Sequence, residues 1–333
     1  MLQADVAQRE DIVLTTRGTI GNTAYFNNAV TFEHLRLNSG MVILRCDRNK
    51  LLPAFLYHFL RSPSFYSQVN GLRSGVAQPQ LPIRDMRQIR LPLPPLPVQQ
   101  RIAGILSAYD ELIENNQRRI RILEDMARSL YREWFVRFRY PGHESVPLVD
   151  STLGQIPQGW EMKKIAELLA KVSRQGKIKT QDYLHAGDLP VIDQGRELVG
   201  GYTNDADVEY SGELPVIVFG DHTRILKFID FPFACGADGT QLLRSNDERM
   251  PVSLFFYTLS AVELSDFAYA RHFKFLKEEL VVVPIAEVAT AFSERVNPIK
   301  RQVRVLQQQS DNLRRTRDLL LPRLLSGQVL LDA

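Results

Sequence analysis

The stretch Leu91-Pro-Leu-Pro-Pro-Leu-Pro-Val-Gln-Gln-Arg-Ile-Ala103 marks an abrupt change in this 333-residue chain, from a proline run to a helical pattern. Closely spaced prolines are incompatible with a helix interior, so they define where a helix can begin. After them, side chains of one face recur in alternating steps of four and three residues. This spacing predicts one long helix over 97–139, ended by Pro141-Gly142, with a seam at Ile102, Leu106, Tyr109, Ile113, Asn116, Ile120, Leu123, Ala127, Leu130 and Trp134.

A second stretch, 286–326, repeats the pattern. Pro298 inside it predicts either a kink or a later start of the helix, and Gly327 suits a C-terminal cap. Its seam is Ala289, Phe292, Val296, Ile299, Val303, Leu306, Ser310, Leu313, Arg317 and Leu320. Both helices keep a period of about 3.5 residues, which favours one shared seam over two separate core helices. We expect them to pack antiparallel, with Asn116 fixing the register and Trp134 and Phe135 as buried anchors in the seam or a subunit interface.

Each long helix follows the same series of shorter patterns, which indicates an internal repeat. The order is strand, strand, short helix, and a strand that runs into proline. The first copy shows it at 11–21, 41–45, 53–60 and 89–92, and the second at 214–220, 240–244, 251–259 and 280–284. Aligning Pro95 with Pro284 leaves the first copy without a counterpart of about 156–189. We therefore expect a first β-rich domain that lacks its N-terminal strand region, through a misplaced start, a truncated gene or a short module.

The repeat predicts an α+β fold with pseudo-twofold symmetry. The predicted parts are a first domain (1–95), a long helix (96–140), a linker (141–155), a second domain (156–283), a second long helix (284–327) and a tail (328–333).

Composition excludes several classes of protein. The chain is 44% hydrophobic and 24% charged, as in ordinary globular proteins. Cys46 and Cys235 fit no metal-binding spacing and favour a reduced, cytoplasmic setting. No apolar run is long enough for a membrane span, and the first residues do not resemble a signal peptide. The net charge of +3 does not by itself indicate a polyanionic partner, so any contact with nucleic acid has to depend on local basic patches.

No motif for catalysis is present in the sequence. A G-x-x-x-x-G-K-[ST] phosphate loop, an Asn-Pro-Pro-aromatic tetrad, and the G-x-G-x-x-G and G-x-S-x-G motifs are all missing. The six histidines are dispersed, which argues against a metal site.

Several motifs, taken together and in order, resemble the specificity subunit of type I restriction-modification systems over nearly the whole chain. Residues 91–103 with 130–138 resemble the central conserved region of that family, and Arg317-Asp-Leu-Leu-Leu-Pro-Arg-Leu-Leu-Ser-Gly327 resembles its distal conserved region. Gly154-Gln-Ile-Pro-Gln-Gly-Trp160 is similar to the opening of a second target-recognition domain. Loop motifs similar to those of the family lie at 17–22, 75–80, 220–223 and 271–276.

The resemblance implies a non-catalytic DNA-reading subunit. It would carry two target-recognition domains, separated by an antiparallel helix pair, that each read half of a split site in double-stranded DNA. Methylation subunits would pack on the helices and restriction subunits would join them. S-adenosylmethionine, ATP and Mg would bind to those partners and not to this chain. The alternative is a coiled-coil scaffold whose β domains bind protein or carbohydrate.

Candidate DNA contacts in the first domain lie in two loops. Arg17 and Thr19 occupy a glycine-flanked turn, where the alternative is a plain hairpin with a solvated arginine. Arg73, Gln78 and Gln80 form a polar loop stiffened by Pro79. Arginine suits guanine, and glutamine suits adenine.

Candidates in the second domain form three groups. Lys171, Arg174, Lys177 and Lys179 are a basic run suited to phosphate, or simply a solvated face. His222, Thr223 and Arg224 follow an apolar strand, where His222 would contact a base or order the loop. Arg271, His272 and Lys274 alternate with Phe273 and Phe275, which predicts a strand with one basic face, either at a DNA-facing edge or simply amphipathic.

Overall fold

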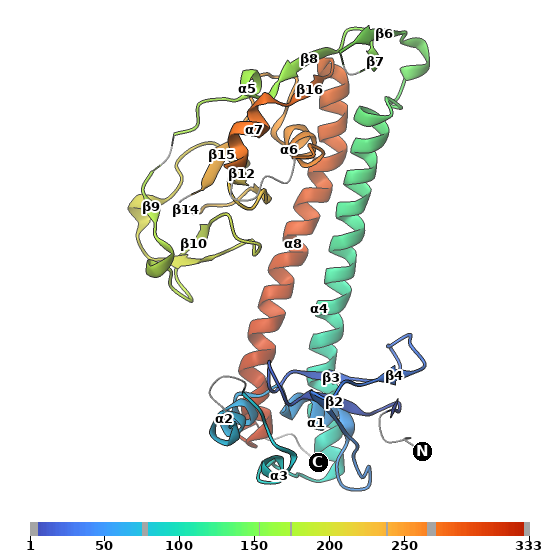
Figure 1. Cartoon of the computed structure of the whole chain (residues 1–333), viewed down its shortest axis with the longest axis vertical. Helices are drawn as coiled ribbons and strands as arrows, with labels where there is room; N and C mark the ends of the chain where they lie inside the picture. The colour runs from blue at the N-terminus through green and yellow to red at the C-terminus, as the bar shows by residue number, and fades with distance from the viewer. Residues whose placement is uncertain are drawn as a thin grey trace. The chain divides into compact units, whose positions relative to one another are not determined.

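The computed structural model describes residues 6–74, 79–152, 154–173, 175–237, 239–264 and 271–329. The chain forms two compact units: unit 1 is Met1–Ile120 with Arg304–Ala333, and unit 2 is Arg121–Val303. Two long helices, α4 (Leu96–Tyr131) and α8 (Ala286–Leu325), each continue from one unit into the other (Figure 1). The predicted α+β class with two β regions and a pair of long helices is confirmed.

Unit 1 holds a small antiparallel sheet covered by short helices. Its strands lie in the order β3-β2-β5, and a separate ladder joins β1 to β4. The strands are β1 (Val6–Ala7), β2 (Ile12–Thr15), β3 (Thr23–Tyr25), β4 (Leu35–Arg36) and β5 (Met41–Leu44), and the helices are α1 (Pro53–Phe59), α2 (Pro63–Leu72) and α3 (Ile83–Met86). Phe55, Phe59 and Leu106 lie in the core between the sheet, α1 and the long helices.

The described residues of unit 2 form more strands, arranged in four small sheets with the orders β11-β10-β14-β9, β13-β12-β15, β16-β8 and β6-β7. The first part of the unit comprises a π-helical turn (Arg132–Val136), a 3-10 turn (His143–Ser145), β6 (Leu148–Ser151), β7 (Gly154–Pro157), β8 (Glu161–Lys164), α5 (Ile165–Leu168) and β9 (Lys177–Ile178). The rest comprises two 3-10 turns (Thr180–Asp182 and Ala206–Val208), β10 (Leu189–Ile192), β11 (Gly201–Thr203), β12 (Val216–Gly220), β13 (Leu226–Ile229), β14 (Ala234–Gly236), β15 (Thr240–Leu243), α6 (Val252–Ser260), α7 (His272–Glu278) and β16 (Leu280–Val283).

The two units share a three-stranded core motif, as the internal repeat predicts. β2 pairs antiparallel with β3 and β5, and β12 pairs in the same way with β13 and β15. A short helix follows in each unit, α1 after β5 and α6 after β15. β2 in unit 1 and β12 in unit 2 are therefore equivalent strands, and the β2–β3 and β12–β13 loops occupy equivalent positions in the repeat.

The predicted strand at 89–92 is wrong. Its counterpart in unit 2, β16, forms because β8 pairs with it, and β8 belongs to the stretch that has no equivalent in the first copy. Among the described residues of unit 1, no strand pairs with 89–92. The side chain of Gln68 satisfies the backbone there instead: its Nε2 donates to the Arg90 carbonyl (2.9 Å), and its Oε1 accepts from the Arg90 N–H (2.8 Å).

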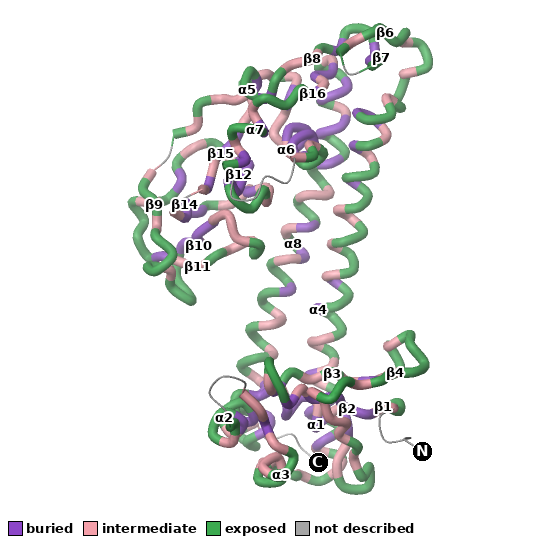
Figure 2. The backbone as a smooth tube through the Cα atoms, viewed as in Figure 1, coloured by how far each residue is buried: buried purple, intermediate pink, exposed green. Residues whose placement is uncertain are grey.

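The long helices pack antiparallel in both units. In unit 1, Arg317 of α8 contacts Asp110 of α4, and the cluster containing Leu106 also contains Leu324. In unit 2, Phe292 of α8 packs against Trp134, while Lys300 and Glu124 line a single pocket. Every predicted seam position is at least partly buried, including Asn116 and Ser310, and such positions recur along both helices (Figure 2). Antiparallel pairing places Ser310 at the level of Asn116.

The helix ends differ from the prediction in two places. The α-helical part of the first helix ends at Tyr131, and a π turn follows to Val136, with Phe138 at a φ of 57°. The chain therefore leaves the helix before Pro141-Gly142. In the second helix a late start is wrong, since α8 begins at Ala286 and continues through Pro298.

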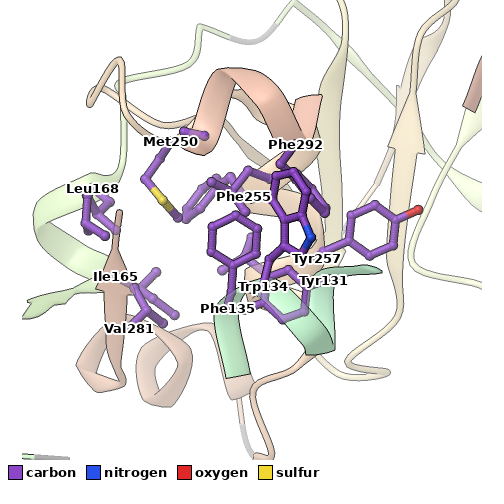
Figure 3. Packing of buried hydrophobic residues seen from close by; sticks show 14 of the residues in the cluster. Tyr131, Trp134, Phe135, Ile165, Leu168, Met250, Phe255, Tyr257, Val281 and Phe292 are labelled. Atoms are coloured by element: carbon purple, nitrogen blue, oxygen red, sulfur yellow. The ribbon is translucent and has the colours of Figure 1, made fainter. Parts of the chain in front are cut away.

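Aromatic side chains dominate the core where the long helices meet unit 2 (Figure 3). Phe292 is fully buried and contacts four rings, of which Phe135 lies edge-on at a centroid distance of 5.0 Å. Lys300, which follows Phe292 along α8, lies among Phe228, Phe256 and Tyr257. Its Nζ is 3.9 Å from the Phe256 ring centroid. Burial lowers the pKa of Lys300 to about 8. Aromatic and cation–π contacts thus fasten α8 to the β-rich part of unit 2.

A polar network joins the long helices to α1 in unit 1. Asp110 accepts hydrogen bonds from Arg61 and from Arg317, both at 2.5 Å. His58 is 2% exposed, and its Nε2 lies 3.1 Å from the Ser107 hydroxyl. Burial, aided by Arg61 and Arg317 and opposed by Asp110, lowers the pKa of His58 to about 4. The imidazole is therefore neutral at physiological pH.

Acidification is expected to destabilise unit 1 through His58. In the unfolded chain the pKa of this side chain is about 6.5, so the unfolded state binds a proton before the folded state does. Stability falls as the pH drops from 6.5 to 4 and then levels off, with a total loss of about 3 kcal/mol. Urea unfolding of unit 1 at pH 7 and at pH 4, monitored by hydrogen exchange in α1, measures this loss.

The matched variant is His58→Gln, which keeps a hydrogen-bonding group beside Ser107 but does not titrate. It should lose clearly less stability than the wild type over the same pH range. Asp110 does not contribute to the difference, because the pKa of its carboxyl is lowered from an ordinary value of 3.8 and therefore lies below the pH range in which His58 titrates. An equal loss in both proteins would assign the effect to other groups.

Candidate nucleic-acid interface

In unit 1, Arg17 and Thr19 lie in the loop between β2 and β3, and both are exposed. Backbone bonds between Thr15 and Asn22 (2.9 Å) and between Gly21 and Thr15 (3.0 Å) close the loop at its base. Gly21 has a φ of +90°, and a Cβ there would lie 3.0 Å from the ring of Tyr66. Glycine is required on both grounds. The loop is thus a defined platform that carries an exposed guanidinium.

The second predicted loop of unit 1 lies beside the first. Ser74 and Gln80 exchange two backbone hydrogen bonds of 2.9 Å, and Gln80 also forms a β-bridge with Arg17. The N–H of Leu81 donates to the Thr16 carbonyl (2.9 Å). Arg17, Thr19, Arg73 and Gln80 therefore belong to one polar surface made from two distant segments. Gln78 lies outside the described residues.

In unit 2, His222, Thr223 and Arg224 occupy the loop after β12, and all three are exposed. Gln194, at the end of β10, holds this loop. Its Oε1 accepts from the His222 N–H (3.1 Å), and its carbonyl accepts from the Thr223 hydroxyl (2.6 Å). A Cβ on Gly220 would collide with Thr223, so glycine is required there. The backbone of His222 is fixed while its imidazole stays at the surface.

Asp221 joins this loop to α7. Its buried carboxylate accepts from the Phe273 N–H (2.8 Å), and its carbonyl accepts from the His272 N–H (2.9 Å). The carboxylate and the backbone carbonyl of one distant residue thus satisfy free N–H groups at the start of a helix. The predicted strand at 271–276 is therefore wrong. His272 is buried, which does not suit a direct DNA contact, whereas Arg271 and Lys274 are exposed.

The basic run of unit 2 lies at the edge strand β9. Lys177 is in β9, Lys179 follows it, and Lys171 precedes it in an irregular segment. All three are exposed, as a phosphate-binding or a merely solvated face requires. Arg174 lies outside the described residues.

A buried ion pair supports the end of β10. Lys227 of β13 is 5% exposed, and its Nζ lies 3.5 Å from the Asp193 carboxylate and 3.4 Å from the Leu198 carbonyl. Burial lowers the pKa of Lys227, although Asp193 opposes the shift. Asp193 precedes Gln194, so this pair anchors the residue that orders the His222 loop.

No group of three or more His, Cys, Asp or Glu side chains among the described residues is arranged to hold a metal ion. No described helix is long and apolar enough to cross a membrane.

Comparison with known proteins identifies the family. Residues 3–125 match the model of the type I restriction modification DNA specificity domain. The type I restriction enzyme MjaIX specificity subunit of Methanocaldococcus jannaschii is 24% identical, over 96% of this chain and 77% of that protein. This chain belongs to the specificity subunits of type I restriction-modification systems.

Other relatives agree with this assignment. The EcoR124I/EcoR124II specificity subunit of Escherichia coli is 29% identical over 28% of this chain and 24% of that protein. The crystal structure of the S subunit of a type I restriction-modification system from M. genitalium superposes with a TM-score of 0.60, covering 95% of this chain and 83% of that one at 17% identity. The specificity subunit therefore has the fold of that S subunit. It is the non-catalytic DNA specificity component of its complex.

Sequence reasoning missed two residues that order the surface of the specificity subunit. Gln194 lies 28 residues before His222 and carries no local motif. Asp221 directly follows the buried strand β12 and lies within the loop motif at 220–223, but only its neighbours His222, Thr223 and Arg224 were predicted as site residues.

Proposed function

We propose that this specificity subunit reads a split sequence in double-stranded DNA, one part through the loops of unit 1 and the other through the loops of unit 2. One observation carries the proposal. The β2–β3 loop with Arg17 and the β12–β13 loop with His222 occupy equivalent positions in the repeat. Two copies of one motif thus present exposed polar side chains from the same place, as two half-site readers would.

The proposal includes partner subunits. Methylation subunits would bind the long helices, where Leu112, Ile122 and Met126 of α4 are more than half exposed despite being apolar. Such exposed apolar side chains on a helix suit a protein interface. Restriction subunits would join the methylation subunits, and S-adenosylmethionine, ATP and Mg would bind to these partners in the cytoplasm.

The test is sequencing of methylated sites in cells that carry this chain with its methylation subunits. The wild type should give one motif with two defined parts and a fixed spacer. Arg17→Ala should relax only the part read by unit 1, and His222→Ala only the part read by unit 2, since loss of a base contact costs about 1–3 kcal/mol. Each variant serves as the control for the other.

Two outcomes would contradict the proposal. A motif that changes in the same part in both variants would exclude one reader per unit. DNA binding by the assembled complex that is insensitive to salt would favour the scaffold alternative, because phosphate contacts release counterions and weaken steeply as salt rises.

A further inference from the structure

One face of the β1–β4 ladder in unit 1 is cationic. Val6 pairs with Arg36 in antiparallel register, and alternate residues of a strand share a face, so Gln8 and His34 lie on the same side as this pair. These four residues and Arg45 line a hollow of about 670 Å³. Glu33 is not among the residues that line the hollow.

The carboxylate of Asp11, which pairs with a residue of this hollow, is neutralised. Asp11 is 1% exposed and accepts two hydrogen bonds from Arg45, at 2.8 Å from Nε and 2.7 Å from Nη2. Its Oδ2 also accepts from the Gln8 N–H (2.7 Å). Asp11 therefore fixes Arg45, whose side chain stays 52% exposed, at the wall of the hollow. Arg36 is exposed and forms no ion pair with any described residue.

The segment that leads to β4 is held in place by Arg9. Its Nη1 donates to the carbonyls of Asn27 (2.7 Å) and Val30 (2.8 Å), and its Nη2 donates to that of Phe32 (3.0 Å). The guanidinium also lies 4.4 Å from the ring centroid of Phe26. His34 and Arg36 are therefore presented by an ordered segment.

We infer that this hollow binds a phosphodiester group of the DNA backbone, and this inference rests on the proposed function. Two guanidinium groups that face one hollow suit the oxygens of a phosphate. Asp11, which holds Arg45 at the hollow, precedes β2 and Arg17 follows it, so the hollow lies roughly 20 Å along the strand direction from the candidate base-reading loop. The contact flanks the bases and increases affinity for any sequence, without selecting one.

The experiment compares Arg36→Gln with Arg84→Gln in the complete complex with methylation subunits. Arg84 is the matched control, because it lies in the same unit with its side chain 85% exposed. Binding is measured from 0.05 to 0.3 M salt on a duplex with the methylated motif and on a scrambled duplex. Loss of one phosphate contact lowers the slope of log K against log salt by about 0.9, which is about a fivefold loss of affinity at 0.15 M.

We expect this loss for Arg36→Gln on both duplexes equally, with the methylated motif unchanged. Backbone ethylation of the duplex should inhibit binding of the wild type at one phosphate that no longer matters for Arg36→Gln. If Arg36→Gln behaves like Arg84→Gln, the inference is wrong. It is also wrong if Arg36→Gln changes the motif. It is wrong as well if Arg36 is needed to bind inorganic phosphate but not to contact any phosphate of the DNA backbone. The preference of the wild type for the methylated motif tests the proposed function separately.

Discussion

Phe292→Ala is expected to destabilise unit 2 by about 3–5 kcal/mol, the range for removing a large aromatic side chain from a core. Phe292 is fully buried and packs against Tyr131, Trp134, Phe135 and Tyr257. The cavity would open where α8 meets the end of α4, so the surrounding helices cannot close it without giving up the antiparallel seam.

The two tryptophans of the chain make this effect measurable. Trp134 and Trp160 both belong to the aromatic cluster of unit 2, so urea unfolding followed by tryptophan fluorescence reports on that unit. The matched control is Met126→Ala on α4 in the same unit, where the side chain is 54% exposed and the expected change is within about 0.5 kcal/mol. A Phe292→Ala protein that unfolds at the same urea concentration as Met126→Ala would show that the cluster does not stabilise the unit.

Patterns confined to neighbouring residues predicted the helices well. The seam of α4 and α8 could be identified because each helical face is encoded within a few turns of sequence. Its pairing direction followed from the repeat. The later start of the helix, one of the two alternatives predicted from Pro298, was wrong because the packing of Phe292 and Val296 keeps the first turns of α8 helical despite the proline.

Features that depend on distant partners were predicted poorly. Residues 89–92 have a strand-like sequence, but a strand needs a neighbour, and Gln68 satisfies the backbone of Arg90 instead. The alternating pattern at 271–276 resembles a strand, yet Asp221, some fifty residues earlier, accepts the first N–H groups of a helix there. Arg17 and Gln80 lie together only because of a bridge across 63 residues, which no local pattern encodes.

The long helices lead to the second large effect, a change in the spacing of the DNA target. α4 and α8 each run without a break from one unit into the other. A copy of residues 113–119 inserted in α4, together with a copy of 303–309 inserted in α8, adds one heptad to both helices and preserves the seam. At about 1.5 Å per residue the two units would move apart by about 10 Å along the helices, with only about 20° of relative rotation.

The expected result is a methylated motif with both parts unchanged and a spacer lengthened by about three base pairs, since B-DNA rises about 3.4 Å per base pair. Sequencing of methylated sites measures the spacer directly. The matched control inserts the heptad in α4 alone. It leaves seven helical residues, two of them seam positions, without partners and displaces Asn116 from the level of Ser310, so methylation should be lost. An unchanged spacer in the double insertion, with methylation intact, would show that the helix pair does not set the distance between the two parts of the target.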